Sequence, residues 1–291
     1  MTEPSDALEA LNPDDAHKAT GAPAHHDDRA TPTRRGFRGF FSELRDDLTR
    51  NNPGPEITVA DVGFLILLCA LLTIFFYWGR PQYFRFSLWN ETAELIGMAR
   101  THEYYGLLPY GYWAIMSVLM RMVLPALIIA LVMKDSVRDY GYRLKGEAAH
   151  ARIYLFLYAF MFPIVVAVSF TTSFQQKYPF YGGSVNGLDH FAIYQLCYGI
   201  QFFGLEAFFR GFVLFALFKR FGYYAIPIMT VPYCMIHFGK PPLETFGSVF
   251  AGLALGYLAL KSKSWVHGAL LHWSIGITMD LLAIFHRGGF K

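Results

Sequence analysis

Charged residues are scarce in this sequence. They make up 16% of its 291 residues, whereas hydrophobic residues make up 54% and the mean hydropathy is +0.30. A soluble globular domain carries about 25% charged residues, so this composition excludes that class. The composition is instead that of a polytopic membrane protein.

Cysteine is also scarce, and no block of one charge sign is present. The three cysteines, Cys69, Cys197 and Cys234, have no CxxC spacing, which argues against a disulfide framework and against a thiolate zinc site. The net charge is only +3, and the Lys and Arg residues lie beside apolar segments. This distribution gives no indication of a nucleic-acid partner.

The chain divides into a polar tail and an apolar bundle. Residues 1–55 are rich in Pro, Asp and His without a sustained apolar period, so we expect a disordered tail. Residues 56–291 are expected to form an all-α transmembrane bundle of about seven to eight helices. The expected spans are 57–79, 110–133, 153–170, 188–218, 224–238, 246–260 and 265–285. The glycines at 247, 252 and 256 have a spacing that permits close helix packing.

The distribution of Lys and Arg predicts the orientation of the bundle. If the N-terminus is inside, most of the basic residues outside the spans fall on the inner side, including those of 134–152. Cytoplasmic loops carry such an excess, so we expect a cytoplasmic N-terminus.

The apolar stretch 188–218 is too long for one straight crossing. Its length corresponds to about 46 Å of helix, whereas the hydrocarbon core is about 30 Å thick. The stretch must therefore tilt, bend or break, and Gly199 and Gly204 are the predicted break points.

Glu206 and Arg210 lie inside this stretch, four residues apart. That spacing places them on one face of a helix, where they can partly neutralise each other. A charged side chain at the bilayer centre costs about 2.5 to 3.5 kcal/mol, so the pair predicts a functional site. The alternative is a clamp between helices.

Two histidines in later apolar segments, His237 and His272, extend this site. A carboxylate and two imidazoles that converge from three helices can activate a water molecule. Glu206, His237 and His272 could equally bind a divalent metal such as zinc, because two His and one Glu leave a coordination position open. In a third interpretation each histidine only forms a hydrogen bond across the bundle. Asp280 is a rival carboxylate, which could instead pair with Arg121 or form a polar contact near the membrane edge.

The order of these motifs resembles the CPBP (CAAX protease and bacteriocin-processing) family of intramembrane proteases. Its pattern is EExxxR, then FxxxH, then HxxxN, and the corresponding segments here are 205–210, 233–237 and 272–276 within a core of about 188–285. Three positions differ from the pattern, since they hold Leu205, Tyr233 and Gly276. The replaced glutamate is thought to activate the water in that family, and the replaced Asn to stabilise the oxyanion.

The resemblance implies an endopeptidase of a bacterial plasma membrane that cleaves a membrane-associated peptide near the bilayer. Glu206 and His237 would then activate water, His272 would stabilise the oxyanion, and Arg210 would order the site. A second hypothesis is a catalytically inactive family member that binds a membrane peptide as an immunity or scaffold protein, which Leu205 and Gly276 favour. A third, a proton-coupled transporter, is disfavoured because the sequence has no inverted repeat.

Overall fold

The computed structural model describes residues 58–143 and 151–291, together with Ser42 and Asp46. The chain separates into two units, Met1–Leu44 and Arg45–Lys291, and the description below concerns the second. Apart from Ser42 and Asp46, the predicted disordered tail of residues 1–55 lies outside the described residues.

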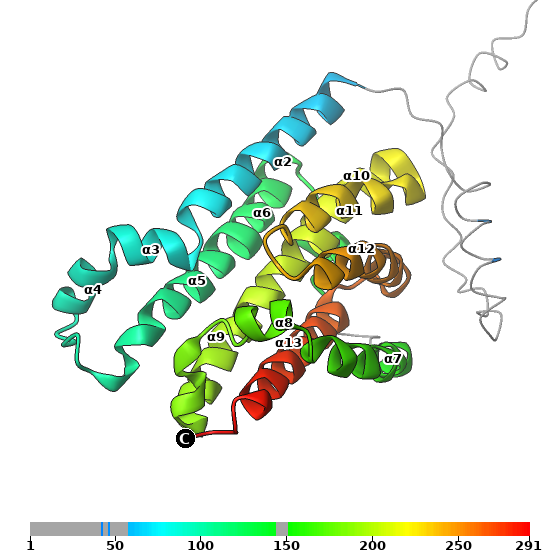
Figure 1. Ribbon diagram of the computed structural model, residues 1–291. Coiled ribbons are helices and arrows are strands. Elements are labelled where there is room, and N and C mark those ends of the chain that lie inside the picture. The colour runs from blue at the N-terminus through cyan, green and yellow to red at the C-terminus, as the bar shows by residue number, and fades with distance from the viewer. Residues whose placement is uncertain (1–41, 43–45, 47–57, 144–150) are drawn as a thin grey trace, which may run out of the picture. The chain divides into compact units, whose positions relative to one another are not determined.

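The described part of the chain is helical and contains no strand, which confirms the expected all-α polytopic bundle (Figure 1). Six runs among these residues are long and apolar enough to cross a membrane. They are Val59–Trp78, Glu103–Val132, Ala151–Ser169, Leu188–Met235, Pro242–Ser262 and Val266–His286.

The first span, α2 (Val59–Trp78), shows how the sequence sets a helix boundary. The Thr58 hydroxyl accepts a hydrogen bond from the Asp61 amide, and the Asp61 carboxylate accepts one from the Thr58 amide. This capping box satisfies two amides that would otherwise lack partners. Arg220, near the end of α10 (Leu214–Phe221), donates to the same carboxylate at 3.0 Å and ties the two helix ends together.

The second span is interrupted where its sequence predicts. It consists of α5 (Leu108–Val118), the π-helical segment η3 (Leu119–Val123), α6 (Leu124–Leu127) and the π-helical segment η4 (Ile128–Val132). Arg121 lies in η3, and Pro125 lies in the first turn of α6, where it lacks the amide that a regular helix would use. The bundle tolerates these irregularities because neighbouring helices cover the backbone.

The long apolar stretch forms the centre of the bundle. In its most apolar window 83% of the residues are buried, compared with 11% to 44% in the other spans. It runs through α9 (Leu188–Glu206), the π-helical segment η8 (Ala207–Val213) and α10 without a break. The predicted breaks at Gly199 and Gly204 are wrong, since both glycines lie inside α9. They instead permit close packing, because a Cβ atom there would lie 2.6 Å from the Trp273 ring and 2.9 Å from the Ser117 carbonyl oxygen, respectively.

The expected span 224–238 is not a full crossing. It contains α11 (Ala225–Met235), whose length of about 16 Å covers roughly half of the hydrocarbon core. This short helix packs against α12 (Pro242–Ser262), and α13 (Val266–His286) packs against both α9 and α7 (Ala151–Ser169) (Figure 1). The remaining helical elements are α3 (Pro81–Ser87), α4 (Trp89–Leu95), η2 (Glu103–Leu107), η5 (Val137–Tyr140), α8 (Thr172–Lys177), η7 (Gly182–Asn186) and η9 (Gly222–Tyr224).

Two of the three predicted packing glycines of α12 lie at its contact with α11. A Cβ atom at Gly252 would lie 2.6 Å from Thr230 Cγ2, and one at Gly256 would lie 3.1 Å from Ile226 Cγ2. A Cβ atom at Gly247 would meet nothing within 4 Å. The close approach of α11 and α12 therefore depends on Gly252 and Gly256.

We predict that Gly252→Ala destabilises the folded protein by about 1 to 3 kcal/mol, because overpacking displaces Thr230 or separates the helices. Thr230 cannot move freely, since its hydroxyl donates to the Ile226 carbonyl at 2.8 Å. Gly247→Ala is the matched control and should be neutral or slightly stabilising, because alanine favours the helix. The unfolding midpoint of the detergent-solubilised protein measures both effects. Equal midpoints for the two variants would contradict the packing assigned to Gly252.

Candidate active site

An ion pair lies at the junction of α9 and η8, in the most buried part of the bundle. Arg210 Nη1 donates to Glu206 Oε1 at 3.0 Å, and both residues have 0% of their surface exposed. The four-residue spacing therefore produces the contact that it predicts. At this depth an unpaired charge would be costly, so each residue stabilises the charge of the other.

Arg210 also connects this pair to two further helices. Its Nη2 atom donates to the Ala251 carbonyl of α12 at 3.3 Å. Its guanidinium carbon lies 3.8 Å from the centroid of the Tyr233 ring in α11, within the range of a cation–π interaction. Because a guanidinium is always protonated, Arg210 can order the site but cannot act as a base.

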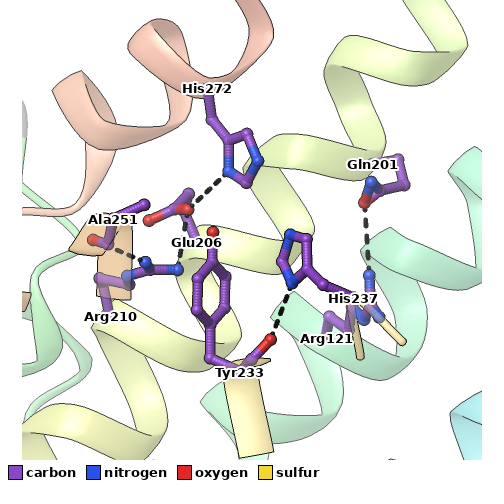
Figure 2. Close-up of polar contacts among 8 residues, drawn as sticks. All are labelled: Arg121, Gln201, Glu206, Arg210, Tyr233, His237, Ala251 and His272. Atoms are coloured by element: carbon purple, nitrogen blue, oxygen red, sulfur yellow. Dashed lines mark hydrogen bonds and ion pairs between the residues drawn. The ribbon is translucent and has the colours of Figure 1, made fainter. Parts of the chain in front are cut away.

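His272 approaches the ion pair from α13 (Figure 2). Its Nδ1 atom lies 3.0 Å from Glu206 Oε1, and its ring centroid lies 4.3 Å from that of Phe202. An ionised carboxylate only accepts hydrogen bonds, so Nδ1 carries the proton, and Nε2 of the neutral ring has a lone pair. The His272 side chain is 17% exposed, whereas Glu206 is fully enclosed.

His237 lies just after α11, where the helix ends (Figure 2). Its backbone amide bonds to the Cys234 carbonyl, and its ring Nδ1 lies 2.8 Å from the Tyr233 carbonyl oxygen. A carbonyl only accepts, so Nδ1 donates here as well, and Nε2 has the lone pair. The residue is 5% exposed, and burial in apolar surroundings favours the neutral form of the ring.

The structure brings the two imidazoles together as a parallel pair. Their ring centroids are 6.4 Å apart and their planes differ by 10°. Glu206, Arg210, His237 and His272, which sequence reasoning selected, therefore meet in one region, with Tyr233 between them (Figure 2). Each Nδ1–H is held by a fixed acceptor, so the two Nε2 atoms are the groups left to bind a reactant.

Sequence reasoning missed Gly268. A Cβ atom at this position would lie 3.3 Å from Glu206 Oε2, so α13 can approach the carboxylate closely. Oε2 is buried and has no hydrogen-bond partner among the described protein atoms. The sequence did contain an indication of this close approach. Gly268 precedes His272 by four residues and therefore shares its helix face.

The proposed metal ligands do not form a metal centre in this geometry. Among the described residues, no group of three or more His, Cys, Asp or Glu side chains is arranged to hold a metal ion.

The rival carboxylate, Asp280, does not form an ion pair with Arg121. Its Oδ2 atom accepts from Gln195 Nε2 at 2.7 Å, whereas Arg121 donates to Gln201 Oε1 at 3.4 Å. Of the two alternatives offered for Asp280, the pairing with Arg121 is therefore wrong. Asp280 instead forms a separate polar contact between α13 and α9.

Two of the three departures from the family pattern, Leu205 and Gly276, are packed by apolar groups. Leu205 is 4% exposed and belongs to the apolar core. A Cβ atom at Gly276 would lie 2.9 Å from the Phe202 ring and 3.3 Å from the Tyr198 ring. An aromatic cluster therefore fills the space that a side chain at position 276 would need.

Comparison with known families places this region in context. Residues 191–278 match the family of type II CAAX prenyl endopeptidase Rce1-like proteins, and this confirms the resemblance to CPBP/CAAX proteases over that segment. At the family level the match supports a CAAX-type intramembrane protease, which implies contact with a lipid bilayer and a peptide substrate. No curated protein and no solved structure was found to match the chain.

We predict that Arg210→Lys destabilises the protein by about 1 to 3 kcal/mol, because the bond to Ala251 and the stacking on Tyr233 are lost while the charge remains. The matched control is Arg143→Lys. Arg143 pairs with Asp139 at the surface, and such pairs contribute little to stability. Thermal unfolding in detergent compares the two variants. If Arg210→Lys is as stable as the parent protein, Arg210 does not order the site.

Proposed function

We propose that this protein is an intramembrane endopeptidase in which His272 acts as the general base and Glu206 orients it. The observation that supports this proposal is the fixed orientation of both imidazoles. Nδ1 of His272 is held by Glu206 and Nδ1 of His237 by the Tyr233 carbonyl, so both Nε2 lone pairs are available for a water molecule. We also propose that the protein lies in a bacterial plasma membrane with its N-terminus in the cytoplasm.

The reaction is hydrolysis of a peptide bond. Water donates one hydrogen bond to His237 Nε2 and transfers its other proton to His272 Nε2 while its oxygen attacks the carbonyl carbon. When the tetrahedral intermediate collapses, the C–N bond breaks and His272 returns the proton to the leaving amine. The Glu206 carboxylate stabilises the imidazolium that forms between these steps, as an orienting carboxylate does in a Ser-His-Asp triad.

This assignment differs from the expectation that Glu206 itself is the base. Its Oε1 atom accepts from two donors, and its Oε2 atom is enclosed against Gly268. Both features favour a role for Glu206 that acts through His272. The 17% exposure of the His272 side chain favours the imidazole as the group that reaches the reactant.

A second candidate function is peptide binding without hydrolysis. The observation that favours it is the packing around Leu205 and Gly276, which is apolar and aromatic. A chain with this packing would keep the fold and the buried ion pair, and would bind a membrane peptide as a scaffold or immunity protein. The two functions differ in whether the purified protein cleaves a membrane peptide at all.

We predict that His272→Ala lowers the single-turnover rate on a membrane-peptide library by about 10²- to 10⁴-fold, the usual contribution of a general base. Added imidazole should restore part of this rate. Glu206→Gln should lower kcat with little change in KM, and imidazole should not rescue it. Asp280→Asn is the control and should retain activity. If Asp280→Asn alone abolishes cleavage, or if imidazole fails to rescue His272→Ala, the assigned base is wrong.

We also predict that restoring the family residues does not increase activity. Leu205→Glu buries a carboxylate in the apolar core and should lower stability by several kcal/mol. Gly276→Asn should displace Phe202 from its contact with His272 and slow cleavage. Both variants are compared with the parent by cleavage rate and unfolding midpoint. If the parent is inert and Leu205→Glu gains activity, the non-catalytic function replaces the proposed one.

A further inference from the structure

A second arginine lies inside the bundle, and its surroundings differ from those of Arg210. Arg121 is 7% exposed, yet among the described residues no carboxylate lies within ion-pair distance of it. Its guanidinium carbon lies 3.6 Å from the centroid of the Phe75 ring in α2. A guanidinium remains charged, and a buried charge without a counter-ion is costly, so this position favours the arrival of an anion.

Among the described residues Arg121 forms one side-chain hydrogen bond, which leaves most of its N–H donors available. A guanidinium has five N–H groups in a planar fork that matches a carboxylate. Arg121 Nη1 donates to Gln201 Oε1 at 3.4 Å, which is a long contact to a neutral acceptor. Gln201 is itself 5% exposed, so the pair is a buried polar group built from η3 and α9.

Figure 2 shows the Arg121–Gln201 pair in the same close-up as the two imidazoles. Gln201 is followed in α9 by Phe202, whose ring centroid lies 4.3 Å from that of His272. The segment η3, which contains Arg121, packs against both α9 and η8. Arg121 therefore lies on a segment that adjoins the elements carrying Glu206 and Arg210.

The depth of Arg121 decides which anions can reach it. At roughly 1.5 Å per residue, Arg121 is about 20 Å from Leu108, where α5 begins, and about 16 Å from Val132, where η4 ends. Lipid headgroups remain at the membrane surface, so they do not reach this depth. A peptide that enters the site can carry a carboxylate to this depth.

We propose that Arg121 and Gln201 form a subsite that binds a carboxylate of the peptide substrate. The proposal rests on the proposed function for the identity of the ligand as a peptide. The carboxylate belongs either to the C-terminus of the peptide or to an acidic side chain. Arg121 supplies the charge and the paired N–H donors, and the Gln201 amide can donate to the same ligand.

The test measures binding rather than cleavage. A short fluorescent Leu/Ala-rich peptide is prepared with a free C-terminus, with a C-terminal amide, and with a C-terminal amide plus one internal Glu. Each form is titrated into the full chain carrying His272→Ala, reconstituted in nanodiscs. One of the two carboxylate-bearing forms should bind at least about tenfold more tightly than the neutral amide, because a charge-assisted hydrogen bond contributes that much. The form that shows the preference identifies the source of the carboxylate.

Three variants on this background distinguish the subsite from a structural clamp. Arg121→Gln removes the charge and should abolish the preference. Gln201→Glu supplies the missing counter-ion within the bundle, so it should also abolish the preference and should raise the unfolding midpoint. This variant keeps the test decisive if Arg121→Gln does not fold. Arg143→Gln removes a surface charge and should leave the preference intact.

Two outcomes overturn the proposal: no preference for either carboxylate, or a preference that persists in Arg121→Gln or Gln201→Glu. A preference that depends on Arg121, in a protein whose parent chain never cleaves peptide, supports the subsite while contradicting the proposed hydrolysis. Cleavage of peptide without any carboxylate preference supports the proposed hydrolysis and contradicts the subsite.

Discussion

The buried ion pair between Glu206 and Arg210 is the interaction on which the rest of the site depends. Both side chains are fully enclosed in the most buried part of the bundle, where each charge requires the other. Arg210 extends the contact to α12 through the Ala251 carbonyl and to α11 through Tyr233, and Glu206 extends it to α13 through His272. One pair thus connects its own continuous helix, α9 and η8, to three other helices.

This constraint also determines what Glu206 can do chemically. Its Oε1 atom already accepts from both a guanidinium and an imidazole, so this oxygen is engaged by two donors. The same contact fixes the ring of His272 with its Nε2 atom directed away from Glu206. The early end of α11 has a parallel effect on His237, since it frees the Tyr233 carbonyl to hold the second ring. The two imidazoles are thus oriented by different parts of the fold.

The two buried arginines show how differently the bundle can accommodate the same charge. Arg210 has a carboxylate, a carbonyl and an aromatic ring as partners, and the carboxylate neutralises its charge. Arg121 has an amide oxygen and an aromatic ring, and its charge is not neutralised within the described residues. A completed pair stabilises a fold, whereas an incomplete one is suited to an incoming ligand.

The sequence by itself determined the membrane class, the helical architecture, most span positions and the pairing of Glu206 with Arg210, because these follow from composition and local spacing. Only the tertiary structure decided which residues the polar side chains contact when the partners lie far apart in the chain. Asp280 bonds to Gln195 rather than Arg121, and Gly199 and Gly204 pack against neighbouring helices rather than breaking α9. Likewise, nothing local predicts that Glu206 and His272 meet, or that Phe202 fills the space at Gly276. These outcomes depend on which helix faces come together, and local spacing carries no information about contacts between helices far apart in the chain.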